Sequence, residues 1–333
     1  MRATVKDVAE RAGVSPKTVS NVINGQVFVR PETRERVELA LAALDYVPNL
    51  TARGLRNGRS GMIALALPDL ATAYSSEMAH FFVEAAHERG WNVQIEETGS
   101  QPGREETLLS RAHAHLVDGL ILNPIAVAES VVTRSSELPP VVVIGEVEQH
   151  RTDQVLVDPV AAADDMTRHL IDRGSRRIAI VGSPQTSAAA TARLRTVGYR
   201  KAVHDAGFPH DRALEIGCDD WSPRGGAAAV GTFLDGNELP DAFFCFTDSI
   251  AIGVLSELWK RGVRVPQDVL VAGFDDVAPG RFAAPPLTTV NFDKRAFADA
   301  ALDHLSHRIA RASARPTRTT IEHRIIPRAS TGE

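Results

Sequence analysis

The sequence has few of the features that mark membrane, secreted or disulfide-rich proteins. It contains only 2 cysteines among 333 residues, Cys218 and Cys245, and their spacing matches no metal-binding motif. No apolar run reaches the roughly 18 residues needed to span a bilayer. The first residues also show no apolar stretch or cleavage site typical of a secretory signal. We therefore expect a cytoplasmic protein with reduced thiols and no membrane partner.

Motifs of common enzyme sites are absent as well. No G-x-G-x-x-G follows an expected strand, and neither G-x-x-x-x-G-K-[ST] nor G-x-S-x-G occurs. Histidines in "HAH" (113–115) and "HLSH" (304–307) have no cysteine or carboxylate set that would complete a metal site. We expect no catalytic residues, no metal and no enzyme cofactor.

Charge is divided unevenly along the chain. The formal net charge is −5, yet residues 1–60 contain 10 Lys/Arg against 6 Asp/Glu. A cationic N-terminal part on an anionic body suggests that this part contacts a polyanion. Charge alone leaves a chance asymmetry open. The length favours two or three domains.

The first 45 residues contain three short helical patterns. The apolar stripe of the first consists of Val5, Val8, Ala9 and Ala12. This helix is expected to end at Gly13, which can adopt a positive φ. A second helix should begin with Ser15 as N-cap and Pro16 as first residue. Pro31 should open a third, whose stripe is Val37, Ala40, Leu41 and Leu44.

Two helices joined by a glycine-containing turn, the second rich in small polar residues, are typical of a helix-turn-helix. The second helix of this motif enters the major groove of DNA. Four residues are expected to face base edges: Pro16, Lys17, Ser20 and Asn21. Four others suit phosphate contacts: Thr4, Ser15, Thr18 and Asn24. On periodicity alone, a helical hairpin with solvated polar faces is the alternative.

The same segment carries a family pattern. "DVAERAGVS", "TVS", "VIN", "TRERV" and "L-Y-P-N" occur in order within residues 5–49 and resemble the head of the LacI/GalR (lactose/galactose repressor) family of bacterial transcriptional regulators. The resemblance implies a repressor that binds double-stranded DNA as a homodimer, at a near-palindromic operator. One departure is Arg30, where the family often has a small residue that caps the third helix.

Residues 49–61, "NLTARGLRNGRSG", are basic and predict a linker with weak helical tendency. Three arginines should contact phosphates: Arg53, Arg56 and Arg59. In the resembled family this stretch folds on DNA, and a leucine that corresponds to Leu55 enters the minor groove. Gly54 lowers helix propensity by about 1 kcal/mol relative to Ala, so we expect order only on DNA. A plain flexible tether is the alternative.

From residue 62, short apolar runs alternate with helical stretches. This alternation is typical of parallel sheets covered on both faces, the doubly wound α/β class. Strands are expected at 62–67, 91–97, 119–123, 140–145, 177–182, 241–246 and 268–274. Helices are expected near 75–90, 104–117, 159–173, 192–207, 223–236 and 248–261.

The resemblance also implies how these elements connect. It implies a two-lobed periplasmic-binding-protein type I body in which the chain crosses three times between the lobes. The expected parts are a helix-turn-helix head (1–48, motif about 5–24), a hinge (49–61), an N-lobe (62–160 and 291–320) and a C-lobe (161–290 and 321–333, with a last strand over 320–326).

Ligands of open parallel sheets bind beyond the carboxyl ends of the strands. The cleft is therefore expected to include 68–74, Asn123, 145–146, 183–195, Trp221, Thr247, Asp248 and Asp275. The resemblance assigns effector contacts to Arg195, Trp221 and Asp275, and places Tyr74 and Phe292 on the N-lobe side. Arginine and aspartate can bind sugar hydroxyls, and tryptophan can stack on a sugar face. Many relatives have an aromatic residue where this chain has Ser75.

Three of these residues have plainer interpretations. For Asp248, a cap on the helix that begins there is as well supported as a contact with the effector. Arg195 would otherwise be an exposed helix residue, and Trp221 an ordinary core residue.

The sequence thus predicts a DNA-binding regulator whose operator affinity is switched by a small-molecule effector. As the effector, the resemblance to the LacI/GalR family favours a carbohydrate over a nucleoside or purine. A solute-binding transport protein is an alternative, against which the basic head and the missing signal argue. An α/β enzyme is another, but no nucleophile–base pair or cofactor loop supports it.

Overall fold

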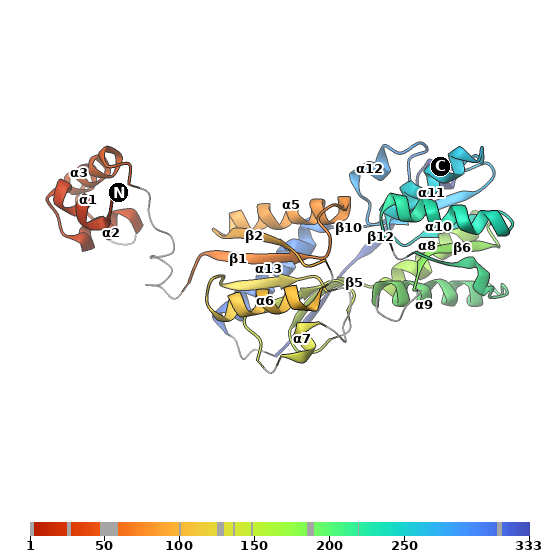
Figure 1. Cartoon of the computed structure of the whole chain (residues 1–333), viewed down its shortest axis with the longest axis horizontal. Coiled ribbons are helices and arrows are strands. Elements are labelled where there is room, and N and C mark those ends of the chain that lie inside the picture. Colours follow the sequence, from red (N-terminus) through yellow and green to blue (C-terminus); the bar gives the residue numbers. More distant parts are fainter. Residues whose placement is uncertain are drawn as a thin grey trace. The chain divides into compact units, whose positions relative to one another are not determined.

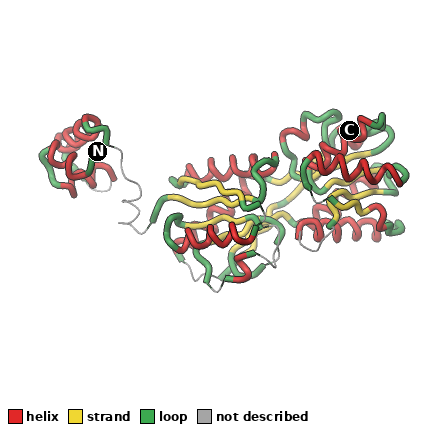
Figure 2. Tube along the Cα trace, viewed as in Figure 1, coloured by secondary structure: helices red, strands yellow, loops and turns green. Residues whose placement is uncertain are grey.

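The computed structural model describes residues 3–24, 28–46, 59–99, 101–124, 130–135, 137–147, 149–184, 190–218, 220–311 and 315–333. These residues form two compact units, Met1–Ser60 and Gly61–Glu333. Figures 1 and 2 show the elements of each unit.

The first unit consists of three helices around a small apolar core. They are α1 (Val5–Ala12), α2 (Pro16–Asn24) and α3 (Pro31–Ala43). Each helix contributes one fully buried valine to this core: Val8, Val19 and Val37. Gly13 ends α1 with a φ of 64° and so permits the turn into α2. The predicted helix-turn-helix is confirmed.

Helix α3 begins where the sequence predicted, although its N-cap is unusual. Arg30 precedes the helix and its side chain makes no capping hydrogen bond. Pro31 nevertheless fixes the first turn, because its ring sets a helical φ and it has no N–H group to satisfy. The departure at Arg30 therefore leaves the start of the helix unchanged.

The second unit contains two six-stranded sheets. The first has the order β11-β5-β4-β3-β1-β2, with β1 (Met62–Leu67), β2 (Asn92–Glu97), β3 (Gly119–Leu122), β4 (Val141–Ile144), β5 (Asp153–Val157) and β11 (Arg318–Ile321). The second has the order β12-β10-β9-β8-β6-β7, with β6 (Ile178–Ser183), β7 (Glu215–Gly217), β8 (Ala242–Cys245), β9 (Leu270–Phe274), β10 (Thr288–Phe292) and β12 (His323–Ile326). Their pairing is parallel except between β10 and β12.

Helices cover both faces of each sheet, as Figure 2 shows. The first lobe contains α5 (Ala73–Glu88), α6 (Pro102–His113), α7 (Val131–Arg134) and α13 (Lys294–Ala310). The second contains α8 (Pro159–Asp172), α9 (Ala190–Asp205), α10 (Pro223–Gly236), α11 (Asp248–Lys260) and α12 (Ala278–Arg281). Alternate residues of strand β1 point to opposite faces of the sheet. Ile63 and Leu65 pack in the apolar layer with α5 and α13, whereas Ala64 and Ala66 pack in the apolar layer with α6. The predicted doubly wound, two-lobed fold is confirmed.

The chain crosses between the lobes at three places: from β5 to α8, from β10 to α13, and from β11 to β12. The sequence predicted a single strand over 320–326, and this prediction was wrong. Two strands lie on either side of Glu322 instead: β11 pairs with β5 in the first sheet, and β12 pairs antiparallel with β10 in the second. Among the described residues, no helix is both long enough and apolar enough to cross a membrane.

Candidate functional site

Helix α2 has one buried face and one polar face. Val19 is fully buried and Val22 nearly so. Ser15, Pro16 and Lys17 are exposed, and Thr18, Ser20 and Asn21 are partly exposed. The Ser15 hydroxyl accepts a hydrogen bond from the Thr18 N–H at 3.1 Å, as an N-cap does. The residues predicted to read base edges thus lie outside the core, in the first two turns.

Thr4 caps the preceding helix. Its hydroxyl oxygen accepts a hydrogen bond from the Asp7 N–H at 3.4 Å, and its own N–H donates to the Asp7 carboxylate at 2.7 Å. The Thr4 hydroxyl also donates to this carboxylate at 2.8 Å, and the two bonds to the carboxylate, the one from the backbone above all, lower the pKa of Asp7. Phosphate contact by exposed Thr4 stays a prediction. The predicted contacts of the Asn24 side chain and of Arg53, Leu55 and Arg56 lie outside the described residues.

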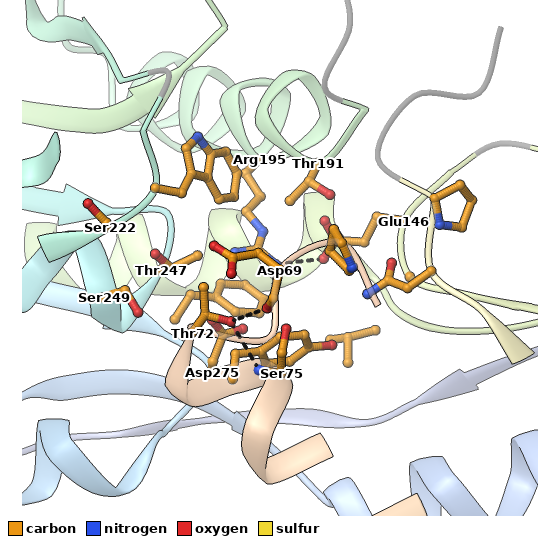
Figure 3. Close-up of a pocket in the computed structure, with 18 of the residues that line it drawn as sticks. Asp69, Thr72, Ser75, Glu146, Thr191, Arg195, Ser222, Thr247, Ser249 and Asp275 are labelled. Atoms are coloured by element: carbon orange, nitrogen blue, oxygen red, sulfur yellow. Dashed lines mark hydrogen bonds and ion pairs between the residues drawn. The ribbon is translucent and has the colours of Figure 1, made fainter. Parts of the chain in front are cut away.

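A cavity of about 730 Å³ lies between the two lobes of the second unit. It opens at the carboxyl ends of strands from both sheets, where ligands of such folds bind. Figure 3 shows its lining side chains. Five of the six residues predicted to contact an effector line it: Tyr74, Arg195, Trp221, Asp275 and Phe292. Phe292 was expected on the N-lobe side. Its backbone ends strand β10 of the second sheet, whereas its ring lies 5.6 Å from that of Phe297 on α13 in the first lobe.

Arg195 reaches the cavity from helix α9 and joins the lobes. Its guanidinium donates to the Glu146 carboxylate of the first lobe at 2.8 Å. It also donates to the Phe246 carbonyl and lies 3.4 Å from the centre of the Phe274 ring. Arg195 is only 5% exposed, so the alternative of an exposed helix residue was wrong.

Asp275 follows strand β9 in a backbone conformation that non-glycine residues rarely adopt. Its φ is 107°, and its N–H donates to the Val290 carbonyl at 2.9 Å. Such conformations cost free energy and cluster at active sites and ligand-binding sites. Burial raises the pKa of Asp275 well above its ordinary value, and the nearby charge of Arg195 opposes this rise. The Asp275 carboxyl group can therefore bind ligand hydroxyls at the cavity wall.

Two aromatic residues add apolar surface. Tyr74 lies in the first turn of α5, which Thr72 caps by accepting from the Ser75 N–H at 3.2 Å. Burial raises the pKa of the Tyr74 hydroxyl, which stays neutral and can donate or accept. Trp221 packs against both apolar layers of the second lobe and also lines the cavity. For Trp221, core packing and exposure to a ligand are thus compatible.

Asp248 does not line the cavity, and its prediction as an effector contact is not supported. It is fully buried. Its carboxylate accepts hydrogen bonds from the Thr289 hydroxyl at 2.6 Å and the Val277 N–H at 2.9 Å. The helix-cap alternative was also wrong, because Thr247 caps α11. Thr247 and Ser249, on either side, do line the cavity.

Several lining residues were not singled out from the sequence: Glu97, Asp220, Ser222, Ser249, Phe274 and Phe297. Glu97 and Phe274 end strands β2 and β9, so the rule of strand ends could have found them. Phe297 lies on α13, more than two hundred residues from Tyr74 in the chain, and no local signal indicates it. In the part of the chain that the structure describes, no group of His, Cys, Asp or Glu could hold a metal ion.

Comparison with known proteins gives consistent matches for both units. Residues 4–49 match the model of bacterial regulatory proteins of the lacI family, and residues 167–331 match a periplasmic binding protein-like domain. The ribose operon repressor of Escherichia coli (strain K12) is 31% identical over 98% of this chain and 99% of its own length. Because this identity extends over nearly both whole chains, it covers the head and both lobes.

Two solved structures are also similar over nearly the whole length. One is the lac repressor dimer bound to operator and the anti-inducer ONPF, with a TM-score of 0.83 and 27% identity over 99% of each chain. The other is the complex of the transcriptional regulator CelR with cellobiose, with a TM-score of 0.74 and 30% identity over 99% of this chain and 100% of that one.

Proposed function

The chain belongs to the lacI family of bacterial regulatory proteins, and from this membership we propose how its head and cleft act together. It is a DNA-binding transcriptional regulator with an effector-binding body, and not an enzyme. We propose that it is a cytoplasmic repressor. The observation that supports control by an effector is the cavity between the lobes, whose polar lining residues come from both lobes. A ligand bound there would contact both lobes at once.

The proposed operator is a near-palindrome bound by a homodimer. Two copies of helix α2 would enter major grooves about one helical turn apart, or a multiple of it. Lys17 and Asn21 would contact base edges, since lysine can donate to guanine and asparagine can bond adenine. Leu55 would enter the minor groove at the centre of the site, with Arg53 and Arg56 on phosphates.

Effector binding would change the angle between the lobes and thereby the distance between the two heads. A ligand shifts this equilibrium only if it binds one lobe arrangement better than the other. The Arg195–Glu146 bond supports such a difference, because it joins the lobes at 2.8 Å inside the cavity. Competition for either partner would favour a different arrangement.

We propose a carbohydrate as the effector. Asp275 and Arg195 offer hydrogen bonds to hydroxyls, and Trp221 offers a flat apolar face. Two similar proteins carry sugar names, the ribose operon repressor and the CelR complex with cellobiose. A nucleoside or purine is the second candidate, since the aromatic lining would also suit a flat base.

Gel shifts with the full chain test the proposal. Duplexes from the region upstream of its own gene should bind tightly, and binding should weaken steeply as salt rises, because phosphate contacts release counterions. A thermal-shift screen of sugars and nucleosides should find an effector, and that compound should alter the gel shift. Failure to bind any of these duplexes, with and without the screened compounds, would contradict the proposal.

A further inference from the structure

The charged side chains around the cavity are mainly acidic. Arg195 is the one cation among the described lining residues. Five carboxyl groups line the same cavity: Asp69, Glu97, Glu146, Asp220 and Asp275. A ligand in the cavity therefore meets an excess of negative charge, which remains even if Asp275 is protonated.

Arg195 offers little attraction to an anion because its charge is already balanced. Its partner Glu146 lies 2.8 Å away, and the two side chains are 6% and 7% exposed. The guanidinium also lies over the Phe274 ring, 3.4 Å from its centre. A phosphate would have to displace the Glu146 carboxylate from Arg195, and the displaced carboxylate would remain beside it.

The other carboxylates are less closely paired with cations than Glu146 is. Asp69 and Glu97 accept backbone N–H bonds from Ala71 and Leu70, at 2.8 and 2.9 Å, and such bonds stabilise a negative charge without cancelling it. Asp220 has a cation nearby, Arg224 at 3.7 Å, whose side chain is 92% exposed.

The buried ion pair also leaves hydrogen-bonding capacity unused. Glu146 Oε2 and Arg195 Nε are buried and have no hydrogen-bond partner among the described residues. Oε2 requires a donor and the Nε–H group requires an acceptor. A hydroxyl group can supply both, whereas a fully ionised phosphate or a carboxylate can only accept. A ligand that shifts the Glu146 and Arg195 side chains and so reaches these two atoms can satisfy both with hydroxyl groups. The two atoms therefore favour a polyhydroxylated molecule.

We propose that the cleft selects a neutral or cationic polyhydroxylated effector and rejects phosphorylated or carboxylated analogues, with Glu146 as the residue that sets this charge selectivity. The inference depends on the proposed function only in treating this cavity as the effector site. Its physical basis is the repulsion between an anionic ligand and nearby carboxylates, which a partly buried site screens poorly.

Matched ligands test the inference on the full chain by calorimetry and thermal shift. The panel pairs glucose with glucose 6-phosphate and glucuronate, and ribose with ribose 5-phosphate, and adds cellobiose and glucosamine. We expect binding only by neutral or amino members, with the anionic counterpart of any ligand weaker by about 100-fold or more. Glu146→Gln should improve the affinity for that anionic counterpart relative to the neutral ligand by at least about tenfold.

Glu238→Gln is the matched control, because Glu238 lies on the surface with its side chain 90% exposed and, among the described residues, pairs only with Arg177. In this variant the ratio of anionic to neutral affinity should not change. An anionic member that binds as well as its neutral counterpart would overturn the inference. So would an unchanged ratio in Glu146→Gln, or a panel in which no neutral or amino member binds. Gel shifts on the same preparation separate the two proposals: a DNA-binding protein switched by an anionic ligand would disprove the charge selectivity alone.

Discussion

The Glu77 carboxylate of helix α5 in the first lobe accepts a hydrogen bond at 2.6 Å from the N–H of Ala278, the first residue of α12 in the second lobe. Its other oxygen accepts from Lys294 at 2.6 Å. The Lys294 ammonium also donates to the Asp276 carbonyl at 3.1 Å. Residues 275–278 thus connect a cavity residue, Asp275, to a contact between the lobes.

Glu77→Gln should weaken this connection. The variant keeps an acceptor for Ala278 but leaves the buried Lys294 without its carboxylate, which should lower the free energy of unfolding by roughly 1–3 kcal/mol. It should also reduce the change in operator affinity that the effector causes. Urea denaturation and operator titrations with and without effector measure both. Glu84→Gln, at an exposed position of the same helix, should change neither, and an unaltered effector response in Glu77→Gln would contradict the expected coupling.

Asp275→Asn should remove much of the effector affinity without unfolding the protein. Asparagine tolerates a positive φ and carries no charge to bury, so thermal stability should be unchanged or higher. Loss of the hydrogen bonds between the carboxyl group and ligand hydroxyls should weaken binding by about 10- to 100-fold. Calorimetry measures this loss, and operator binding without effector serves as the control. Wild-type effector affinity in the variant would exclude Asp275 from the site.

Local apolar patterns predict part of the fold well. Strand β1 and helix α10 have the predicted bounds, 62–67 and 223–236. The first is one continuous apolar run, and Ser222 and Pro223 mark the start of the second. Strand β5 was not predicted, because its first residues, Asp153 and Gln154, are polar yet buried. Asp153 accepts a hydrogen bond from Arg308, 155 residues away, at 2.5 Å. No local pattern reveals such a distant partner.

The same limit applies to the site. Strand ends correctly indicated the places of Glu146 and Asp275 at the cavity. The rule failed for Asp248, because the side chain after a strand can also turn inward and bond to other strands, as it does with Thr289. The bond between Glu146 and Arg195 spans the two lobes. It depends on how the lobes meet, which neither residue's neighbours in the sequence determine.

Asp248 should make stability depend on pH. Burial raises its pKa from 3.8 to about 7, so between these values the folded protein holds a proton that the unfolded chain has released. The stabilisation is therefore complete below about pH 4 and is lost as the pH rises towards 7. Because Asp248→Asn cannot ionise, its free energy of unfolding relative to wild type should rise by roughly 1–3 kcal/mol between about pH 5 and pH 8.

Urea denaturation of wild type and Asp248→Asn at several pH values measures this difference. Asp172→Asn is a suitable control, because Asp172 is exposed at the end of α8. The control should follow the wild-type profile. Parallel profiles for wild type and Asp248→Asn would mean that the buried carboxyl group does not titrate in this range.

Asn21→Ala should relax the base preference of the head at one operator position. Asn21 lies partly exposed on the polar side of α2, one turn beyond exposed Lys17, and its amide can bond adenine through two hydrogen bonds. Its loss should cost about 1–3 kcal/mol on the preferred base and much less on the others, with an unchanged salt dependence. Arg53→Ala provides the contrast, since loss of a phosphate contact should weaken all duplexes alike and reduce the salt slope by about 1. Anisotropy titrations over single-base operator variants measure both, and equal losses on every duplex for Asn21→Ala would assign Asn21 to the phosphate backbone.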